Sequence, residues 1–298
     1  MALLGGLSWQ SSAPAAITYT FAYPDNAGDE GWNNANNWTS DPNTPGGIPG
    51  SELPGGAGET SDDIVIIGSR SAGGNLNINL NNTNAGTIAT LTLGAGHTTN
   101  NTDARPQLRI YGGTNAQLVI TGDLILGGVG GSNGTTQFQG DLQVGNGTGT
   151  GGRGRLTVSG DINSASTGDH DITINAGGSA DAGAGIDTWG MTFGGNIDAG
   201  LEELGAHEID LTINRGYFDW TNLSGIAYVE DFNVVDIGNQ NLVNTTWELK
   251  DGQKIVASAR SDVGRNSSNA TQTGISIGTF DLNGTFTANA TGTNAFVI

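Results

Sequence analysis

The stretch Leu118-Val119-Ile120-Thr121-Gly122-Asp123-Leu124 decides the fold, because it holds the end of one strand, a corner and the start of the next strand. Apolar residues at alternate positions predict a short strand with one buried face. Gly followed by Asp is typical of a corner, since Gly tolerates positive φ and the Asp side chain bonds to the local backbone. We therefore expect short strands joined by tight corners.

This pattern recurs along the chain. The spacing of Gly122, Gly140 and Gly160 predicts a repeat of about 20 residues, with two or three strands in each copy. Such repeats favour a parallel β-helix (β-solenoid), in which stacked coils share one core and pair their backbones. An antiparallel β-sandwich is the alternative. The further copies are Phe138-Gln139-Gly140-Asp141-Leu142, Leu156-Thr157-Val158-Ser159-Gly160-Asp161-Ile162 and Met191-Thr192-Phe193-Gly194-Gly195-Asn196-Ile197.

Apolar residues in strict alternation identify the expected core. Their period of two places them on one face of each strand, with Asn and Thr on the other. The expected core residues are Leu76, Ile78, Leu91, Leu93, Leu108, Ile110, Leu118, Ile120, Leu156, Val158, Ile172 and Ile174.

Changes in this rhythm divide the chain into three parts. Residues 1–61 are expected to form an irregular N-terminal arm (1–16), a strand near 17–23 and a Trp- and Pro-rich capping segment, in which Trp32 and Trp38 pack over the end of the core. Residues 62–207 are expected to form the β-solenoid. Residues 208–298 are expected to form a β-rich C-terminal cap or small domain, with a hairpin turn at Asp251-Gly252.

Composition and charge exclude several classes of function. The chain has 298 residues, 51 of them Gly, no Cys and a net charge of −19. So few basic residues argue against nucleic-acid binding and against anionic membrane surfaces. No apolar run approaches the length of a membrane helix. The N-terminal stretch lacks a basic segment, so we expect no cleaved signal peptide.

No group of residues points to catalysis, so we expect no enzyme, no cofactor and no metal site. Asp169, His170 and Asp171 alternate faces in a strand, and His97 and His207 have no metal-ligand spacing around them. No nucleophile elbow or phosphate loop is present. Two further hypotheses are less favoured. The carboxylates of Asp123, Asp141 and Asp161 could stack in one row, although a role at corners is favoured for them. Thr92, Thr157 and Thr173 could form a rank of hydroxyl groups that binds ice.

The segment from Trp32 to Ile67, with Asn-Asn-Trp, a Pro-rich loop and Asp-Asp-Ile-Val-Ile, resembles the autotransporter-associated β-strand repeat proteins, together with the Gly-Asp-Leu steps that follow. The resemblance covers roughly residues 30–200 and implies a parallel β-helix of the bacterial surface. In composition the chain is also similar to β-helical capsid cement and fibre proteins of bacteriophages.

These observations predict a structural protein of a bacteriophage virion, a capsid decoration or cement protein, or else a tail or fibre component. Its expected partners are the major capsid protein or another virion protein, and further copies of itself as a homo-oligomer, for which a trimer is the expectation. A secreted or cell-surface adhesin is the alternative, and a carbohydrate-active enzyme ranks third. Leu3, Leu4, Leu7 and Trp9 are the expected assembly contacts, because apolar side chains on a free arm are costly to leave in water.

Overall fold

Short β-strands make up almost all of the described chain, and the one helix among the described residues is the 3₁₀ turn η1 (Ala35–Asn37). The structure is a computed structural model. It describes residues 16–21, 31–40, 53–55, 63–68, 76–81, 84–95, 106–113, 116–129, 137–138, 140–146, 152–165, 170–175, 190–197, 209–215, 217–219, 226–236, 245–249, 251–257, 261–266, 278–282, 285–288 and 296–297.

Three sheets carry most of the strands. The six-stranded sheet 1 contains β1 (Thr18–Phe21), β2 (Trp38–Ser40), β3 (Ile64–Gly68), β6 (Thr90–Ala95), β9 (Leu124–Leu126) and β14 (Ile162–Ser164). The eight-stranded sheet 2 contains β4 (Leu76–Asn81), β7 (Pro106–Tyr111), β12 (Asp141–Val144), β15 (His170–Asn175), β17 (Ile209–Arg215), β20 (Phe232–Asp236), β23 (Ser261–Asn266) and β26 (Phe296–Val297). The five-stranded sheet 3 contains β5 (Asn84–Ile88), β8 (Gln117–Ile120), β13 (Arg155–Val158), β16 (Gly190–Phe193) and β18 (Tyr217–Asp219).

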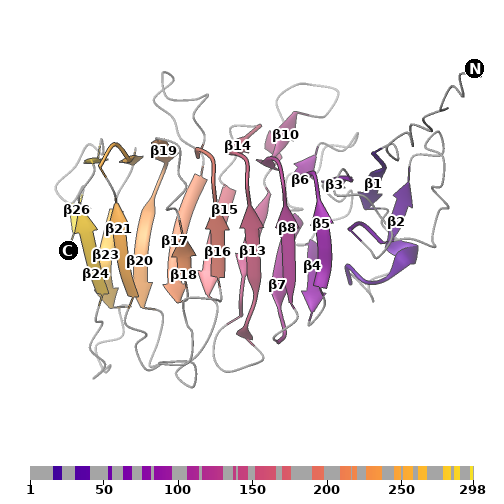
Figure 1. Cartoon of the computed structure of the whole chain (residues 1–298), viewed down its shortest axis with the longest axis horizontal. Helices are drawn as coiled ribbons and strands as arrows, with labels where there is room; N and C mark the ends of the chain where they lie inside the picture. The colour runs from indigo at the N-terminus through magenta and orange to yellow at the C-terminus, as the bar shows by residue number, and fades with distance from the viewer. Residues whose placement is uncertain are drawn as a thin grey trace, which may run out of the picture.

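Smaller groups of strands complete the described part. They are β19 (Ile226–Val229) with β22 (Lys254–Ala257) and β25 (Thr285–Ala288), β21 (Thr245–Leu249) with β24 (Gly278–Leu282), and β10 (Gly128–Val129) with β11 (Gln137–Phe138). Single bridges from Ile197 to Ile162 and to Ala227 connect the first of these groups to sheet 1. Figure 1 shows the strands following one another along the long axis in the order of the sequence.

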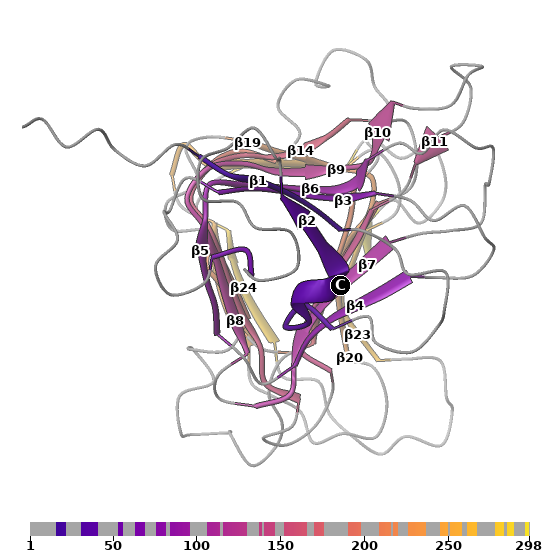
Figure 2. The same cartoon turned by 90° about the vertical axis from the view of Figure 1, so that its right-hand side faces the viewer.

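The strands pair in parallel nearly everywhere. Among the described strands, only β1 with β2 and β10 with β11 pair antiparallel. An antiparallel sandwich is therefore wrong for this chain. Between β3 and β9, strands that follow one another in sequence lie in different sheets, and Figure 2 shows the three sheets on three sides of a common interior.

The repeat is longer than the sequence pattern predicts. Leu108 pairs with Leu142, and Leu118 pairs with Leu156. These partners are 34 and 38 positions apart, whereas Leu211 and Phe232 are 21 apart, so one passage through the sheets, which we call a level, varies in length. A uniform repeat of about 20 residues is wrong, because the Gly-Asx motif occurs at more than one corner of a level. Gly140 precedes β12 of sheet 2, whereas Gly122 and Gly160 lie after strands of sheet 3.

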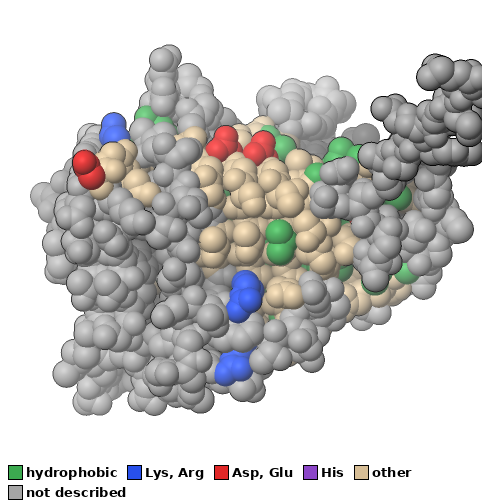
Figure 3. Space-filling view, in the orientation of Figure 1, with side chains coloured by type: hydrophobic (Ala, Val, Ile, Leu, Met, Phe, Trp, Pro, Cys, Tyr) green, Lys and Arg blue, Asp and Glu red, His purple; other side chains and the backbone are tan. Residues whose placement is uncertain are grey.

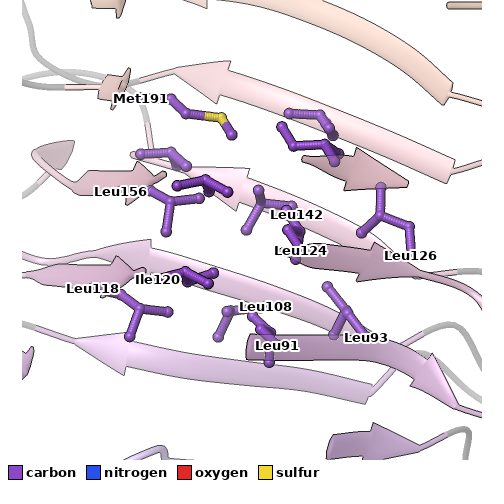
Figure 4. Packing of buried hydrophobic residues seen from close by; sticks show 14 of the residues in the cluster. Leu91, Leu93, Leu108, Leu118, Ile120, Leu124, Leu126, Leu142, Leu156 and Met191 are labelled. Carbon is purple, nitrogen blue, oxygen red and sulfur yellow. The ribbon is translucent and has the colours of Figure 1, made fainter. Parts of the chain in front are cut away.

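The alternating apolar residues form one buried cluster that runs from Ile17 to Ala257. Eleven of the twelve expected core residues have no exposed surface, and the side chain of Leu76 lies outside the described residues. Partners in register stack apolar side chains over one another, as Leu118 over Leu156 and Met191 (Figure 4). This apolar interior is the main stabilising feature of the fold.

The Trp-rich segment covers the edge of sheet 2. The backbone N–H of Trp32 donates to the carbonyl of Asn79 in β4 (3.0 Å), and the indole N–H of Trp38 donates to the carbonyl of Trp32 (2.8 Å). Both indoles are buried, with ring centroids 4.9 Å apart, and Phe21 packs edge-on against Trp38. The expected packing of Trp32 and Trp38 over the core is confirmed, and it protects backbone groups that an open edge exposes.

The C-terminal third continues the parallel pairing. β17 pairs with β15, β20 with β17 and β23 with β20. Asp251 and Gly252 form the expected turn, with Gly252 at φ +84°, but not a hairpin. β21 pairs with β24, and β22 pairs with β19 and β25, so the turn passes the chain between different groups of strands. The division of the chain at residues 61 and 207 stays a prediction.

Candidate functional site

A ladder of Gly-Asx corners links sheet 3 to sheet 1. Asp123, Asp161 and Asn196 each follow a Gly and precede the next strand or bridge. The backbone N–H of Asp161 donates to Oδ1 of Asp123 (2.8 Å), and the N–H of Asn196 donates to Oδ1 of Asp161 (2.7 Å). We call these three residues the Gly-Asx ladder. The expected corner role of Asp123 and Asp161 is confirmed, since each carboxylate satisfies a backbone donor of the next level.

The glycines of the ladder are required by close packing. A Cβ on Gly160 would lie 2.6 Å from the carbonyl carbon of Gly122 and closer still to Oδ1 of Asp123. A Cβ on Gly195 would lie 2.5 Å from the carbonyl carbon of Gly160. A side chain at either position collides with backbone as well as with the acceptor. Gly at these corners therefore permits the direct stacking of one Asx on the next.

A second file of carboxylates runs along the start of the strands in sheet 2. Asp171 is in register with Asp210. Leu142 pairs with Ile172, and Leu211 pairs with Phe232, so Asp141 and Asp231, which precede Leu142 and Phe232, lie in the same row. We call Asp141, Asp171, Asp210 and Asp231 the aspartate column. Backbone donors link it, from the N–H of Asp171 to Oδ1 of Asp141 (3.3 Å) and from the N–H of Asp231 to Oδ1 of Asp210 (3.1 Å).

Like charges in this column act on Asp210. Burial, together with the charges of Asp231, Glu230 and Asp171, raises the pKa of Asp210 from its ordinary value of 3.8 to about 7, against the opposing effect of the hydrogen bond from the N–H of Asp231. Carboxylates at successive strands of a sheet are about 4.8 Å apart, so their repulsion is not fully screened. We therefore expect the stability of the fold to depend on pH near neutrality.

His170 is a buried residue that directly precedes Asp171 of this column. It has no exposed surface, and its Nδ1 accepts a hydrogen bond from the backbone N–H of Gly140 (3.1 Å). An accepting Nδ1 carries no proton, so the imidazole is held in the tautomer with hydrogen on Nε2. His170 thus satisfies a buried backbone donor.

The outer side of sheet 3 has a different chemistry. In register, Thr87 pairs with Val119, Val119 with Thr157 and Thr157 with Thr192. We call these four residues the Thr/Val rank. They are half-buried, and the exposed Thr121 and Ser159 lie just after the ends of β8 and β13. Arg155 is the one charged residue of β5, β8, β13 and β16.

The structure brings some of the predicted residues together and separates others. Asp123 and Asp161 stack, but Asp141 belongs to the aspartate column, so a common row of these three carboxylates is wrong. Thr92, Thr157 and Thr173 lie in sheets 1, 3 and 2, so the expected rank of these three does not exist. Some predicted residues lie outside the described ones: His97, Asp169, His207, and the arm residues Leu3, Leu4, Leu7 and Trp9.

Sequence reasoning missed the aspartate column and the Thr/Val rank. The available signal for the column was an Asp immediately before an apolar strand residue, as in Asp171-Ile172, Asp210-Leu211 and Asp231-Phe232. Only the register shows that these residues are neighbours, because they are 30 positions apart at the first step of the column and 21 at the last.

The Asp and His side chains of the ladder and the column accept hydrogen bonds from backbone N–H groups, and the Thr/Val rank lies on the outer surface of sheet 3. No set of three or more His, Cys, Asp or Glu side chains in the described ranges is arranged to hold a metal ion. Within the same ranges, no helix has the length and apolar character needed to cross a membrane. Comparison with protein-family models, with curated proteins and with solved structures finds no match.

Proposed function

We propose that the chain is a β-solenoid that serves as a structural protein of a bacteriophage virion, with a decoration or cement role on the capsid shell. In this proposal the three sheets are the faces of one parallel coil, and each level adds one turn of the coil. The resemblance to β-helical surface proteins stays part of the proposal.

The observation that carries a structural role is the repetition of the same stabilising contacts from level to level. The core residues of sheet 3 stack in register from Ile88 through Ile120 to Val158, all without exposed surface. The Gly-Asx ladder adds a hydrogen bond from a backbone N–H to a carboxylate at each step. Stacked repeats of this kind form elongated bodies with extended side surfaces, which suit lattice reinforcement and binding.

The proposed role is binding rather than catalysis. The carboxylates of Asp123, Asp141 and Asp161 accept backbone N–H groups, which is a structural use of the side chain. The proposed partner is the major capsid protein or another virion protein, and the proposed location is the virion. Leu3, Leu4, Leu7 and Trp9 remain the proposed contacts of the arm.

Mass spectrometry of purified phage particles from the source tests this proposal. We expect the chain in many copies per particle, in a fixed ratio to the major capsid protein, and we expect added chain to rebind particles from which it was removed. A few copies per particle would place it in the tail or fibre. Its absence from particles, with recovery from the bacterial surface or medium, would favour the adhesin and overturn the virion role.

The arm has its own test. Deletion of residues 2–12 removes Leu3, Leu4, Leu7 and Trp9 and should abolish particle binding while the melting temperature stays unchanged. A lower melting temperature with particle binding intact would mean that the arm only caps its own fold.

A further inference from the structure

The outer side of sheet 3 is a broad surface with few charges. Figure 3 shows this side toward the viewer, and its described side chains are mainly uncharged. The Thr/Val rank occupies its middle, across β5, β8, β13 and β16. The register then pairs Thr192 with Asp219 of β18.

Opposite charges border this surface. Arg155 begins β13, and Asp161 follows the same strand beyond its far end. Asp123 lies one level before Asp161 in the Gly-Asx ladder. Acidic side chains accordingly lie along the upper border of this surface in Figure 3, and basic side chains lie along its lower border.

We propose that this surface binds the same surface of a second copy of the chain, with Arg155 of each copy opposite the Asp123 and Asp161 border of the other. A twofold axis parallel to the stacking direction of the strands produces this arrangement. It turns one face onto the other and reverses the strand direction, so the basic border of one copy meets the acidic border of the next. The contact is isologous, as in most homodimers, and it is an alternative to the trimer expected from the sequence.

Charge favours a second copy over an unrelated acidic partner. The chain has a net charge of −19, so two copies repel unless they meet where acidic groups are scarce or paired. Sheet 2 carries the aspartate column at the start of its strands, which disfavours the approach of another acidic chain there. The outer side of sheet 3 presents hydroxyl and methyl groups at its centre and complementary charges at its borders. Such complementarity sets the register of a contact.

This inference is separate from the proposed virion role, because it concerns the purified chain in solution. Analytical ultracentrifugation of the full-length chain is the test. We expect a dimer at moderate ionic strength, where salt screens the long-range repulsion between two chains of net charge −19. A monomer at all salt concentrations tested, or a trimer, would overturn the twofold contact.

Two matched pairs of variants locate the contact. Thr157→Arg puts like charges at the centre of the face and should yield a monomer, whereas Thr173→Arg, at an equivalent half-buried position in β15 of sheet 2, should leave the dimer intact. Arg155→Glu should weaken the dimer at least about tenfold, because the twofold axis repeats each contact and the variant loses the charge pairs at both borders, whereas Arg109→Glu in β7 should not. Equal effects of Thr157→Arg and Thr173→Arg would contradict the assignment to sheet 3.

A charge-reversal experiment tests the pairing of the two borders directly. Mixing Arg155→Glu chains with Asp123→Lys chains should restore part of the association, because the introduced carboxylate of one chain then faces the introduced ammonium of the other. Circular dichroism melts of each variant separate a lost contact from a lost fold. Folded variants that fail to associate on mixing would overturn the proposed pairing. If Asp123→Lys does not fold, the comparison of Thr157→Arg with Thr173→Arg still decides the proposal.

Discussion

The Gly-Asx ladder and the aspartate column use the same hydrogen bond with opposite electrostatic results. In both, a carboxylate Oδ1 accepts the backbone N–H of the residue one level on. The ladder has a neutral side chain, Asn196, at its third position, whereas the column consists of acids throughout. The comparison shows that an Asp side chain can accept a backbone N–H at either kind of corner. Where every member of the row is acidic, however, the neighbouring carboxylates repel one another, and this repulsion depends on pH.

The largest expected effect comes from filling the space in the ladder. Gly160→Ala should lower the free energy of unfolding by about 3 kcal/mol or more, because its Cβ collides with backbone and with Asp123. Gly252→Ala is the matched control, since nothing lies within 4 Å of its Cβ and only the φ of +84° opposes it, at about 1 kcal/mol. Urea unfolding of both variants measures the difference. Equal losses would contradict the close stacking of the ladder.

Removal of the His170 imidazole, beside Asp171 of the column, should have the next largest effect. His170→Ala leaves the buried N–H of Gly140 without its acceptor and leaves a cavity, which should cost about 2–3 kcal/mol of unfolding free energy. Thermal and urea unfolding report the loss. His170→Asn, which offers a shorter acceptor, should recover a part of it, and no difference between the two variants would argue against the Gly140 bond.

A smaller effect is expected from a single ladder acceptor. Asp161→Ala removes the bond from the N–H of Asn196 and should cost about 1–2 kcal/mol. Asp161→Asn keeps an oxygen at the same place and should retain most of the stability. Hydrogen exchange at the Asn196 amide distinguishes the two, because only the Ala variant should exchange faster there. Unchanged exchange in the Ala variant would show that this bond does not protect the amide.

The last expected effect is a pH dependence of the column. The pKa of Asp210 is raised from 3.8 to about 7, so between these values the folded state holds a proton that the unfolded chain releases. The stability contributed by that proton is fully present below pH 3.8 and is lost as the pH rises through about 7. Asp210→Asn should therefore gain melting temperature relative to the native chain as the pH rises.

The difference in melting temperature between Asp210→Asn and the native chain should grow as the pH rises from the acidic to the alkaline side of the Asp210 pKa. Melting curves across that range provide the measurement. Parallel curves for Asp210→Asn and the native chain would show that the charges of Asp171, Glu230 and Asp231 do not act on Asp210 as described.

Much of the fold follows from local sequence patterns, namely the alternation of apolar residues and the Gly-Asx dipeptides. Strict alternation identified Leu108, Ile110, Leu118 and Ile120 as buried, because a strand turns every second side chain to the same face. Gly-Asp and Gly-Asn marked the corners, since only Gly fits where backbone lies against backbone. These properties need no knowledge of distant residues.

Register and pairing were decided by the tertiary structure. Gly122 and Gly140 carry the same motif, yet one belongs to the ladder and the other precedes the aspartate column, because the lengths of the intervening segments determine which sheet each strand joins. The turn at Asp251-Gly252 likewise looks like a hairpin, and the partners of β21 and β22 make it a passage between sheets. Local sequence determines whether a residue points inward, but backbone pairing across 30 or more positions determines which residues become neighbours.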